Sequence, residues 1–534
     1  MDASSLVHAL AQEGTVAHDE VCLASAGQLE RAARFVAVHL GDRPEIFEEL
    51  EQAQGAGADA DDVWALLGRL WAQLADSFDP TPGSAAARAQ LASEDSRIAL
   101  ALAAAKLERN LVAGVYEYQK AAHPHEPAVR RVIFNVTTFT RIEDPKFFTL
   151  HAVLAQLLSN LVSPTSDPRS EDLADTTLET YLSGGRDDDV VIRLLDSRDI
   201  KTNTATIHLI NNLTRDERRI PLLLRPAGVK WLAQLLGRMD EWLEAQDGLF
   251  ELAAAIFSRV IDAGLQAQLY AALAVPDEAV TPSQTTLLKL VDSSLASASP
   301  SSPNPAPSPN AFILDAWHAL ARYAALSMNS GQDDARLPKI LAALILATEA
   351  LSAIVLRAQA RADAAERKRR PVVAGGDEEM VAAMKSGEKS VVKPLVELLR
   401  ATNTFLPRVK PTRPEDAPEA TQAQLPFANI KRDLVRLLAA LAYGDTAFGD
   451  AVREAGGVEL VLSLCETDER NPYLREHALL AVRNLMTGNP ANQAIIAQMD
   501  PLGVVGDNGE LLPLPEKMKK GYQSTVAPGP DGAA

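Results

Sequence analysis

The chain has 534 residues, of which 47% are hydrophobic, 23% are charged and only 5% are aromatic. An apolar content carried mainly by leucine, alanine and valine favours packed helices over a β-sandwich. The net charge of −19 disfavours nonspecific binding to nucleic acid and to anionic membranes.

The two cysteines, Cys22 and Cys465, are far apart in the sequence, which indicates a reducing compartment rather than a disulfide framework. The first residues lack the basic start and apolar core of a signal peptide, and no apolar run is expected to reach membrane-spanning length. We therefore expect a cytoplasmic protein that does not insert into membranes, with nuclear access left open.

Residues 1–295 are expected to form N-terminal helical repeats. A strong helical pattern ends in Asn110-Leu, and the same ending recurs at Asn160-Leu and Asn212-Leu, at spacings of 50 and 52 residues. Endings that recur at such intervals indicate repeat units into which loops have been inserted.

Residues 296–310 are rich in serine and proline, and this composition predicts a disordered linker. Ser299, Ser302 and Ser308 each precede a proline, so they are candidates for proline-directed phosphorylation, which would add about −1.5 to −2 charge per site. The alternative is that these pairs are ordinary features of a linker.

Helical repeats are expected to resume over residues 311–407 and to be followed by a polar loop at 408–427. A C-terminal repeat domain then covers 428–505, and a flexible tail covers 506–534. Within this domain the run Leu-Ala-Tyr-Gly-Asp is matched by Leu-Met-Thr-Gly-Asn 44 residues later. That period is typical of armadillo and HEAT repeats, so we predict an all-α, armadillo-like right-handed helical solenoid with loop insertions.

Motifs for reaction chemistry are missing from the sequence: there is no phosphate-binding loop, no dinucleotide fingerprint and no zinc signature. Accordingly we expect no catalytic residue, no cofactor and no metal site. The segment His123-Pro-His125 is interpreted as an exposed hinge rather than a metal site. Met380 and Met384 share a helical face, which is interpreted as packing rather than as a copper site.

Several stretches of the C-terminal domain resemble the ataxin-10 family. They are Asp433-Leu-Val-Arg-Leu-Leu, Val452-Arg-Glu, Asn471-Pro-Tyr-Leu-Arg-Glu-His and Val482-Arg-Asn-Leu with the following Gly-Asn-Pro. The resemblance implies armadillo-like repeats, no known catalysis, and roles in cytokinesis and cell survival through protein contacts. Fungal members also carry a copper-transport name.

The sequence departs from the armadillo pattern at three positions. Ala440 stands where the repeats usually have asparagine, and His477 and Leu480 stand where tryptophan is expected. A deep tryptophan-asparagine groove for extended basic peptides is therefore not expected.

The third helix of an armadillo repeat faces the concave surface, where asparagine amides can bond an extended partner. We expect Glu476, Leu480 and Asn484 to form one stripe of such a helix, with Arg483 at its rim. On this hypothesis Asn484→Ala weakens partner binding and leaves melting almost unchanged. The alternative is that Asn484 bonds the neighbouring turn and serves only the fold.

These observations favour a non-catalytic scaffold that binds other proteins during cell division, with self-association left open. The partners themselves cannot be inferred from the sequence. The alternative is a copper homeostasis factor or the regulatory subunit of an enzyme.

Overall fold

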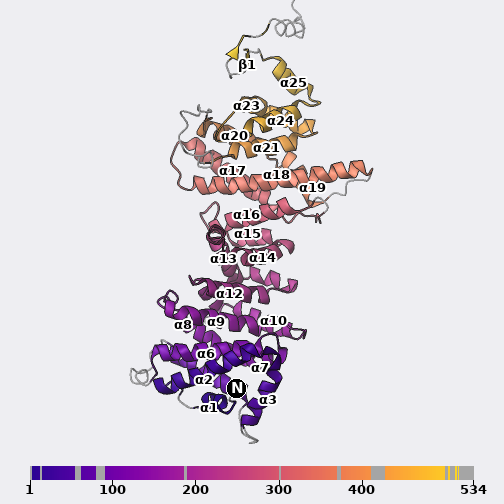
Figure 1. Ribbon diagram of the computed structural model, residues 1–534. Helices are drawn as coiled ribbons and strands as arrows, with labels where there is room; N and C mark the ends of the chain where they lie inside the picture. The colour runs from indigo at the N-terminus through magenta and orange to yellow at the C-terminus, as the bar shows by residue number, and fades with distance from the viewer. Residues whose placement is uncertain are drawn as a thin grey trace, which may run out of the picture. The chain divides into compact units, whose positions relative to one another are not determined.

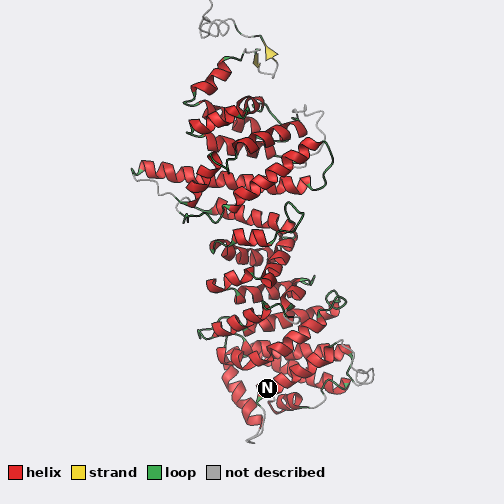
Figure 2. Cartoon of the chain, turned by 180° about the vertical axis from the view of Figure 1, so that it is seen from behind, coloured by secondary structure: helices red, strands yellow, loops and turns green. Residues whose placement is uncertain are grey.

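A computed structural model describes residues 3–12, 15–54, 62–79, 91–185, 189–299, 302–369, 375–409, 427–499, 503–505, 511–513 and 515. They form two compact units, which we describe separately: unit 1 is Met1–Ser299 with Pro309–Phe312, and unit 2 is Pro300–Ser308 with Ile313–Ala534. Figure 2 shows that the described parts of both units are almost entirely helical. The predicted all-α class is confirmed, and the strands described are the two-residue pair β1 (Val504–Val505) and β2 (Leu511–Leu512).

Unit 1 repeats one order of helices: a short helix, a second helix and a third helix. The third helices pack against one another in chain order, as do the second helices. The third helices are α2 (Asp19–Val38), α6 (Glu94–Val112), α9 (Pro145–Leu161), α12 (Ile200–Leu213) and α14 (Leu249–Asp262). The second helices are α4 (Val63–Phe78), α8 (Glu126–Val136), α11 (Val190–Leu195), α13 (Pro226–Glu244) and α16 (Pro282–Ser297).

The remaining elements of unit 1 are short and connect one repeat to the next. They are α1 (Ala3–Ala11), η1 (Leu40–Asp42), α3 (Arg43–Gln54), α7 (Tyr116–Ala122), η2 (His123–His125), α10 (Ser170–Tyr181), η3 (Glu217–Leu224) and α15 (Gln266–Ala272). In Figure 1 the helices α6, α9 and α12 follow one another as successive layers of the unit. This arrangement is the predicted armadillo-like solenoid.

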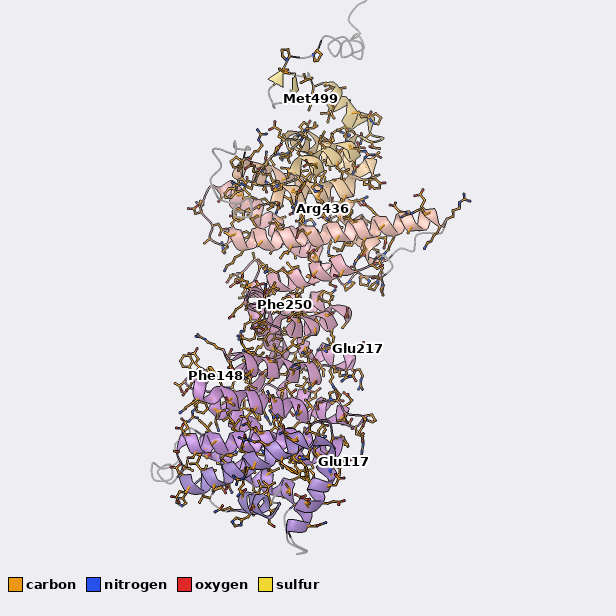
Figure 3. The ribbon with its side chains drawn as sticks, in the orientation of Figure 1. Glu117, Phe148, Glu217, Phe250, Arg436 and Met499 are labelled. Carbon is orange, nitrogen blue, oxygen red and sulfur yellow. The ribbon has the colours of Figure 1, made fainter. Side chains whose placement is uncertain are left out.

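Unit 2 contains a second series of packed third helices, α18 (Leu337–Arg367), α21 (Ile430–Ala442) and α24 (Leu474–Met486). Its other helices are α17 (Phe312–Ser330), α19 (Gly376–Lys385), α20 (Val392–Phe405), α22 (Thr446–Glu454), α23 (Gly457–Ser463) and α25 (Pro490–Ala497). Leu434, Leu437 and Leu441 of α21 are fully buried and belong to the core of unit 2. Figure 3 shows side chains between the helices of each unit, with Arg436 labelled on α21.

The turns that end α21 and α24 show why the C-terminal repeat is legible in the sequence. Gly444 and Gly488 lie just beyond the two helix ends with φ of 65° and 67°, a conformation that costs glycine little. The next residue caps the following helix in both repeats: Asp445 accepts a hydrogen bond from the backbone N–H of Phe448, and Asn489 accepts one from Asn492. The same chemistry therefore stops one helix and starts the next.

Helix α18 corrects one expectation. It is long and apolar enough to cross a membrane by length and composition, whereas the sequence analysis expects no such run. However, 61% of its most apolar window is buried within the chain, where α18 packs against α19 and α21. The apolar surface of α18 thus serves the core of unit 2.

The serine-proline segment is also more structured than its composition predicts. Asn304 accepts a hydrogen bond from the backbone N–H of Asp377 (3.0 Å) and donates one to the carboxylate of Glu378 (2.5 Å). A Cβ on Gly376 would lie 2.1 Å from the carbonyl oxygen of Pro305, so the segment packs directly on the start of α19. The prediction of disorder is therefore wrong for residues 302–310.

The three candidate phosphorylation sites differ in exposure. Ser299 is exposed and Ser302 is half-buried, whereas Ser308 is 7% exposed. Modification of Ser308 would require the segment to leave α19. Most of the predicted polar loop at 408–427 and of the predicted tail at 506–534 lies outside the described residues.

Candidate functional site: the third-helix face

Asparagine side chains connect successive third helices of unit 1. The amide nitrogen of Asn160 on α9 donates to the carbonyl oxygen of Arg109 on α6 (3.1 Å), and that of Asn212 on α12 donates to Ser159 on α9 (3.0 Å). Asn110 on α6 likewise donates to Ala33 on α2 (2.9 Å). The recurring Asn-Leu endings of the sequence therefore mark side chains that join each repeat to the one before.

The position of the accepting carbonyls explains why these bonds form. Arg109 and Ser159 lie within the last four residues of α6 and α9, where backbone carbonyls have no partner inside their own helix. An unbonded buried carbonyl costs about 1–3 kcal/mol. The asparagine of the next repeat supplies the missing donor, and its amide is held in one orientation as a result.

The same bond occurs in unit 2. Asn484 on α24 donates to the carbonyl oxygen of Ala439 on α21 (2.9 Å), which is again among the last four residues of its helix. Ala440 occupies the usual asparagine position on α21, and Gln359 of α18 instead donates to its carbonyl oxygen (2.6 Å). The donor amide of Asn484 is thus used by the fold, as the alternative interpretation of this residue predicts.

The other residues of the predicted stripe are accessible. Glu476, Leu480 and Arg483 are exposed on α24, with Leu480 44% exposed, while Asn484 is half-buried. The structure therefore places Glu476, Leu480 and Arg483 on a free face of α24, and partner binding there stays a prediction.

Charged groups are also found on α21 and α18, the third helices that precede α24 in unit 2. Arg432 donates to the buried carboxylate of Asp433 (2.8 Å) and lies 3.9 Å from a carboxylate oxygen of Glu349. Burial raises the pKa of Asp433 to about 6, although Arg432 favours the charged form. Burial and the nearby cations Arg436 and Arg432 lower the pKa of His477. This face of unit 2 therefore carries both signs of charge.

A groove of about 480 Å³ opens between α9 and α12 in unit 1. Its lining consists of Gln156, Ser159, Asn160, Lys201, Thr204, Ala205, His208 and Asn212. The residues from α12 recur at intervals of three, four and seven or eight, which places them on one helical face. The groove thus lies along the two asparagines that join these repeats.

The polar groups of the groove fall into acceptors and donors. The amide nitrogens of Asn160 and Asn212 are bonded to the fold, and neither side-chain oxygen has a protein partner among the described residues. The guanidinium of Arg109 donates to the side-chain oxygen of Gln156 (2.5 Å), which leaves the Gln156 amide nitrogen as a donor. The side chains of Lys201 and His208 are exposed and make no hydrogen bond or ion pair to described residues.

Asn160 and Asn212 were predicted from the sequence as markers of repeats, but the groove itself was not predicted. The signal was the polar stripe of Lys201, Thr204, His208 and Asn212, which share one face of α12. This stripe becomes recognisable as one wall of a groove only when α9 is known to lie beside α12.

The histidine segment also differs from its prediction. His125 is 5% exposed and its Nδ1 lies 2.8 Å from a carboxylate oxygen of Glu108, whose other oxygen accepts a hydrogen bond from the indole of Trp71 (2.5 Å). Although burial opposes it, the bond to Glu108 raises the pKa of His125. His125 is therefore a buried partner of Glu108, and the prediction of an exposed hinge is wrong.

No group of three or more His, Cys, Asp or Glu side chains arranged for a metal ion occurs among the described residues. Met380 and Met384 are 4% and 0% exposed, in agreement with their interpretation as packing residues.

The helix order and the asparagine bonds place this chain among the armadillo-like helical-repeat proteins, and its candidate site is the third-helix face. Residues 430–523 match the family model described as the spinocerebellar ataxia type 10 protein domain. The predicted resemblance to the ataxin-10 family is thereby confirmed over the C-terminal domain.

Curated relatives support the same assignment. The chain is 35% identical over 81 residues to an ataxin-10 homolog of Candida albicans, covering 15% of this chain and 18% of the relative. It is 39% identical over 85 residues to an ataxin-10 homolog of Dictyostelium discoideum (16% and 14%) and 38% identical over 75 residues to ataxin-10 of Bos taurus (14% and 16%). Each alignment thus covers less than a fifth of the relative.

Among solved structures, the chain is similar to SYS-1, with 10% identity, a TM-score of 0.31 and coverage of 93% of this chain and 95% of that one. An engineered protein gives 17% identity, a TM-score of 0.34 and coverage of 91% and 99%. The armadillo-like class rests on the helix order and bonds described above.

Proposed function

We propose that this protein is a non-catalytic scaffold that binds extended segments of other proteins across its third-helix face and acts in cytokinesis and cell survival. The observation that carries the proposal is the groove between α9 and α12, where the side-chain oxygens of Asn160 and Asn212 have no partner among the described residues. The similarity of the C-terminal domain to ataxin-10 supports the cellular role.

The chemistry of the groove suits a peptide backbone. An extended chain presents N–H and C=O groups on both edges, and it needs fixed acceptors and donors to replace its bonds to water. Asn160 and Asn212 provide acceptors, and Gln156 provides a donor. Because the asparagine amides are already oriented by Arg109 and Ser159, binding does not have to order them.

The stripe of Glu476, Leu480 and Arg483 on α24 is a second candidate surface for partners. We propose a cytoplasmic location with nuclear access, as expected from the sequence. The copper alternative is not advanced, since Met380 and Met384 are occupied in packing.

A blocked groove tests the proposal. Thr204→Trp places a large side chain in the lining of the groove, whereas Leu243→Trp adds the same side chain at a 54% exposed position on α13, outside the third helices. Cells depleted of the protein would receive the wild type or either variant, and cytokinesis would be scored by the fraction of binucleate cells.

Proteins that co-purify with each variant from the same cells would be identified by mass spectrometry. We expect the Leu243→Trp variant to restore division and to retain the partners that co-purify with the wild type. The Thr204→Trp variant should do neither. Equal rescue by both variants, with the folded Thr204→Trp variant retaining its partners, would reject the groove as the binding site.

A further inference from the structure

The α9/α12 groove has no carboxylate in its lining, unlike two other grooves among the described residues. None of its eight lining residues is a carboxylate, although acidic residues outnumber basic ones in the sequence, 71 to 52. The groove of about 700 Å³ between α17 and α20 includes Glu397 together with Arg322 and Arg400, and that of about 420 Å³ between α14 and α16 includes Asp262. In an acidic chain, a groove lined by a lysine and by no carboxylate favours a negatively charged ligand.

The lysine and the histidine of the groove are accessible to a ligand. Lys201 and His208 are exposed, seven residues apart on α12, and therefore about 10 Å apart along the helix. The nearest carboxylate in the sequence, Asp199, accepts hydrogen bonds from the backbone N–H and the hydroxyl of Thr202 (2.8 and 2.7 Å), so it is engaged in capping α12. A negatively charged side chain bound in the groove would meet Lys201 without competition from an existing ion pair.

The acceptors set the spacing of the bound backbone. Asn160 and Asn212 belong to neighbouring packed helices, which lie about 8–10 Å apart. An extended chain advances about 3.3 Å per residue and points successive N–H groups to opposite edges, so N–H groups two residues apart on one edge, about 6.6 Å from each other, approach the two oxygens. A helical ligand would have its N–H groups bonded internally and would leave these acceptors unused.

We propose that the α9/α12 groove binds an extended acidic segment of a partner protein, with carboxylates facing Lys201 and His208 and backbone N–H groups bonded to Asn160 and Asn212. This proposal rests on the proposed function and adds the chemical class of the partner. The source of charge is the aspartate and glutamate side chains of a protein.

Short unstructured peptides provide the test. Three fluorescein-labelled peptides share one sequence frame and carry glutamate, glutamine or lysine at the same positions, and binding to the full chain is followed by fluorescence anisotropy. We expect the glutamate peptide to bind, the other two to bind at least about tenfold more weakly, and the binding to weaken as ionic strength rises.

Charge reversal in the groove has a matched control. Lys201→Glu should weaken binding of the glutamate peptide about tenfold or more. Lys230→Glu makes the same change of charge at an exposed lysine on α13, outside the groove, and should leave the affinity within about twofold. Circular dichroism and thermal melting establish that both variants fold.

The proposal is overturned if the glutamine peptide binds as well as the glutamate peptide, or if Lys230→Glu weakens binding as much as Lys201→Glu. It is also overturned if a phosphoserine peptide of the same frame binds and the glutamate peptide does not, because the groove would then recognise phosphate. If the acidic preference fails but Thr204→Trp still abolishes partner capture, the scaffold function stands and only the partner class is wrong. If the peptides show no acidic preference and Thr204→Trp also leaves partner capture intact, both proposals are rejected.

Discussion

The bond from Asn484 to Ala439 gives the sharpest stability prediction. Ala439 is 1% exposed, and its carbonyl oxygen lies among those that α21 cannot satisfy itself. Asn484→Ala removes the donor from this carbonyl, so we expect unit 2 to lose about 1–2 kcal/mol of unfolding free energy. For a unit of this size, that loss lowers the melting temperature by about 2–8 °C.

Two further variants distinguish the hydrogen bond from the loss of volume. Asn484→Asp keeps the shape but cannot donate when ionised, so it should destabilise at least as much as alanine at pH 7 and less at acid pH, where a protonated carboxyl donates. Arg483→Ala changes an exposed neighbour on α24 and should alter the melting temperature by less than about 1 °C.

The assay is urea denaturation followed by tryptophan fluorescence and circular dichroism, together with hydrogen exchange at the end of α21. The reasoning is refuted if Asn484→Ala melts like the wild type while a partner dissociates. That outcome would restore the original prediction from the sequence, in which Asn484 is a binding residue.

Three other predictions concern buried charge and backbone packing. Burial raises the pKa of Asp433 to about 6 from 3.8, so the folded state binds more protons between these values and loses stability as the pH rises through them. The free energy of unfolding of the Asp433→Asn variant should therefore exceed that of the wild type by about 1–3 kcal/mol at pH 7.5 and by almost nothing at pH 4. Urea denaturation measures both values. The raised pKa of His125 stabilises unit 1 fully below about pH 6.5, and this contribution is lost as the pH rises through the pKa of the folded state. The difference in unfolding free energy between the wild type and Glu108→Gln should therefore shrink from pH 6 to pH 9. A difference that is independent of pH would contradict the ion pair. Gly376→Ala forces a Cβ against the backbone of Pro305, so limited proteolysis within residues 302–310 should accelerate severalfold. Gly331→Ala is the control: a Cβ there would meet nothing within 4 Å, although the φ of 67° disfavours alanine. It should not increase cleavage within residues 302–310.

The repeated helices were predictable because their signals are local. Gly444 and Gly488 end two helices by the same conformation, and Asp445 and Asn489 begin the next helices by the same cap. These features depend on residues within a few positions of one another, so the period of 44 residues could be recognised in the sequence without knowledge of the packing.

The failed predictions depend on contacts between distant residues. The burial of His125 follows from its bond to Glu108, 17 residues earlier, and the order of the serine-proline segment follows from bonds between Asn304 and residues more than 70 positions later. Composition and spacing carry no information about such partners. In each case a polar group finds a partner across the fold and is thereby removed from the surface where its residue type is usually found.

The candidate site also combines features that the local sequence predicts with features that depend on packing. The asparagine endings were predictable as a pattern, but the direction of their amide bonds was not, because it depends on which carbonyls the preceding helix leaves unbonded. The groove needs α9 and α12 side by side, which brings Gln156 and Asn160 within reach of Lys201 and His208. The sequence pattern indicated α24 instead, where Asn484 makes the same amide bond to the preceding third helix as Asn160 and Asn212 do in unit 1.

Site-specific photo-cross-linking tests the central claim most directly. An aliphatic diazirine side chain, small enough to leave the groove open, would be placed at Thr204 or His208 in the α9/α12 groove, or at Leu480 on α24, in the full chain expressed in its own cells. Our account predicts that a partner is cross-linked from positions 204 and 208 through an acidic, extended segment identified by mass spectrometry. Cross-links that form only from position 480 would contradict it and place the binding surface on α24.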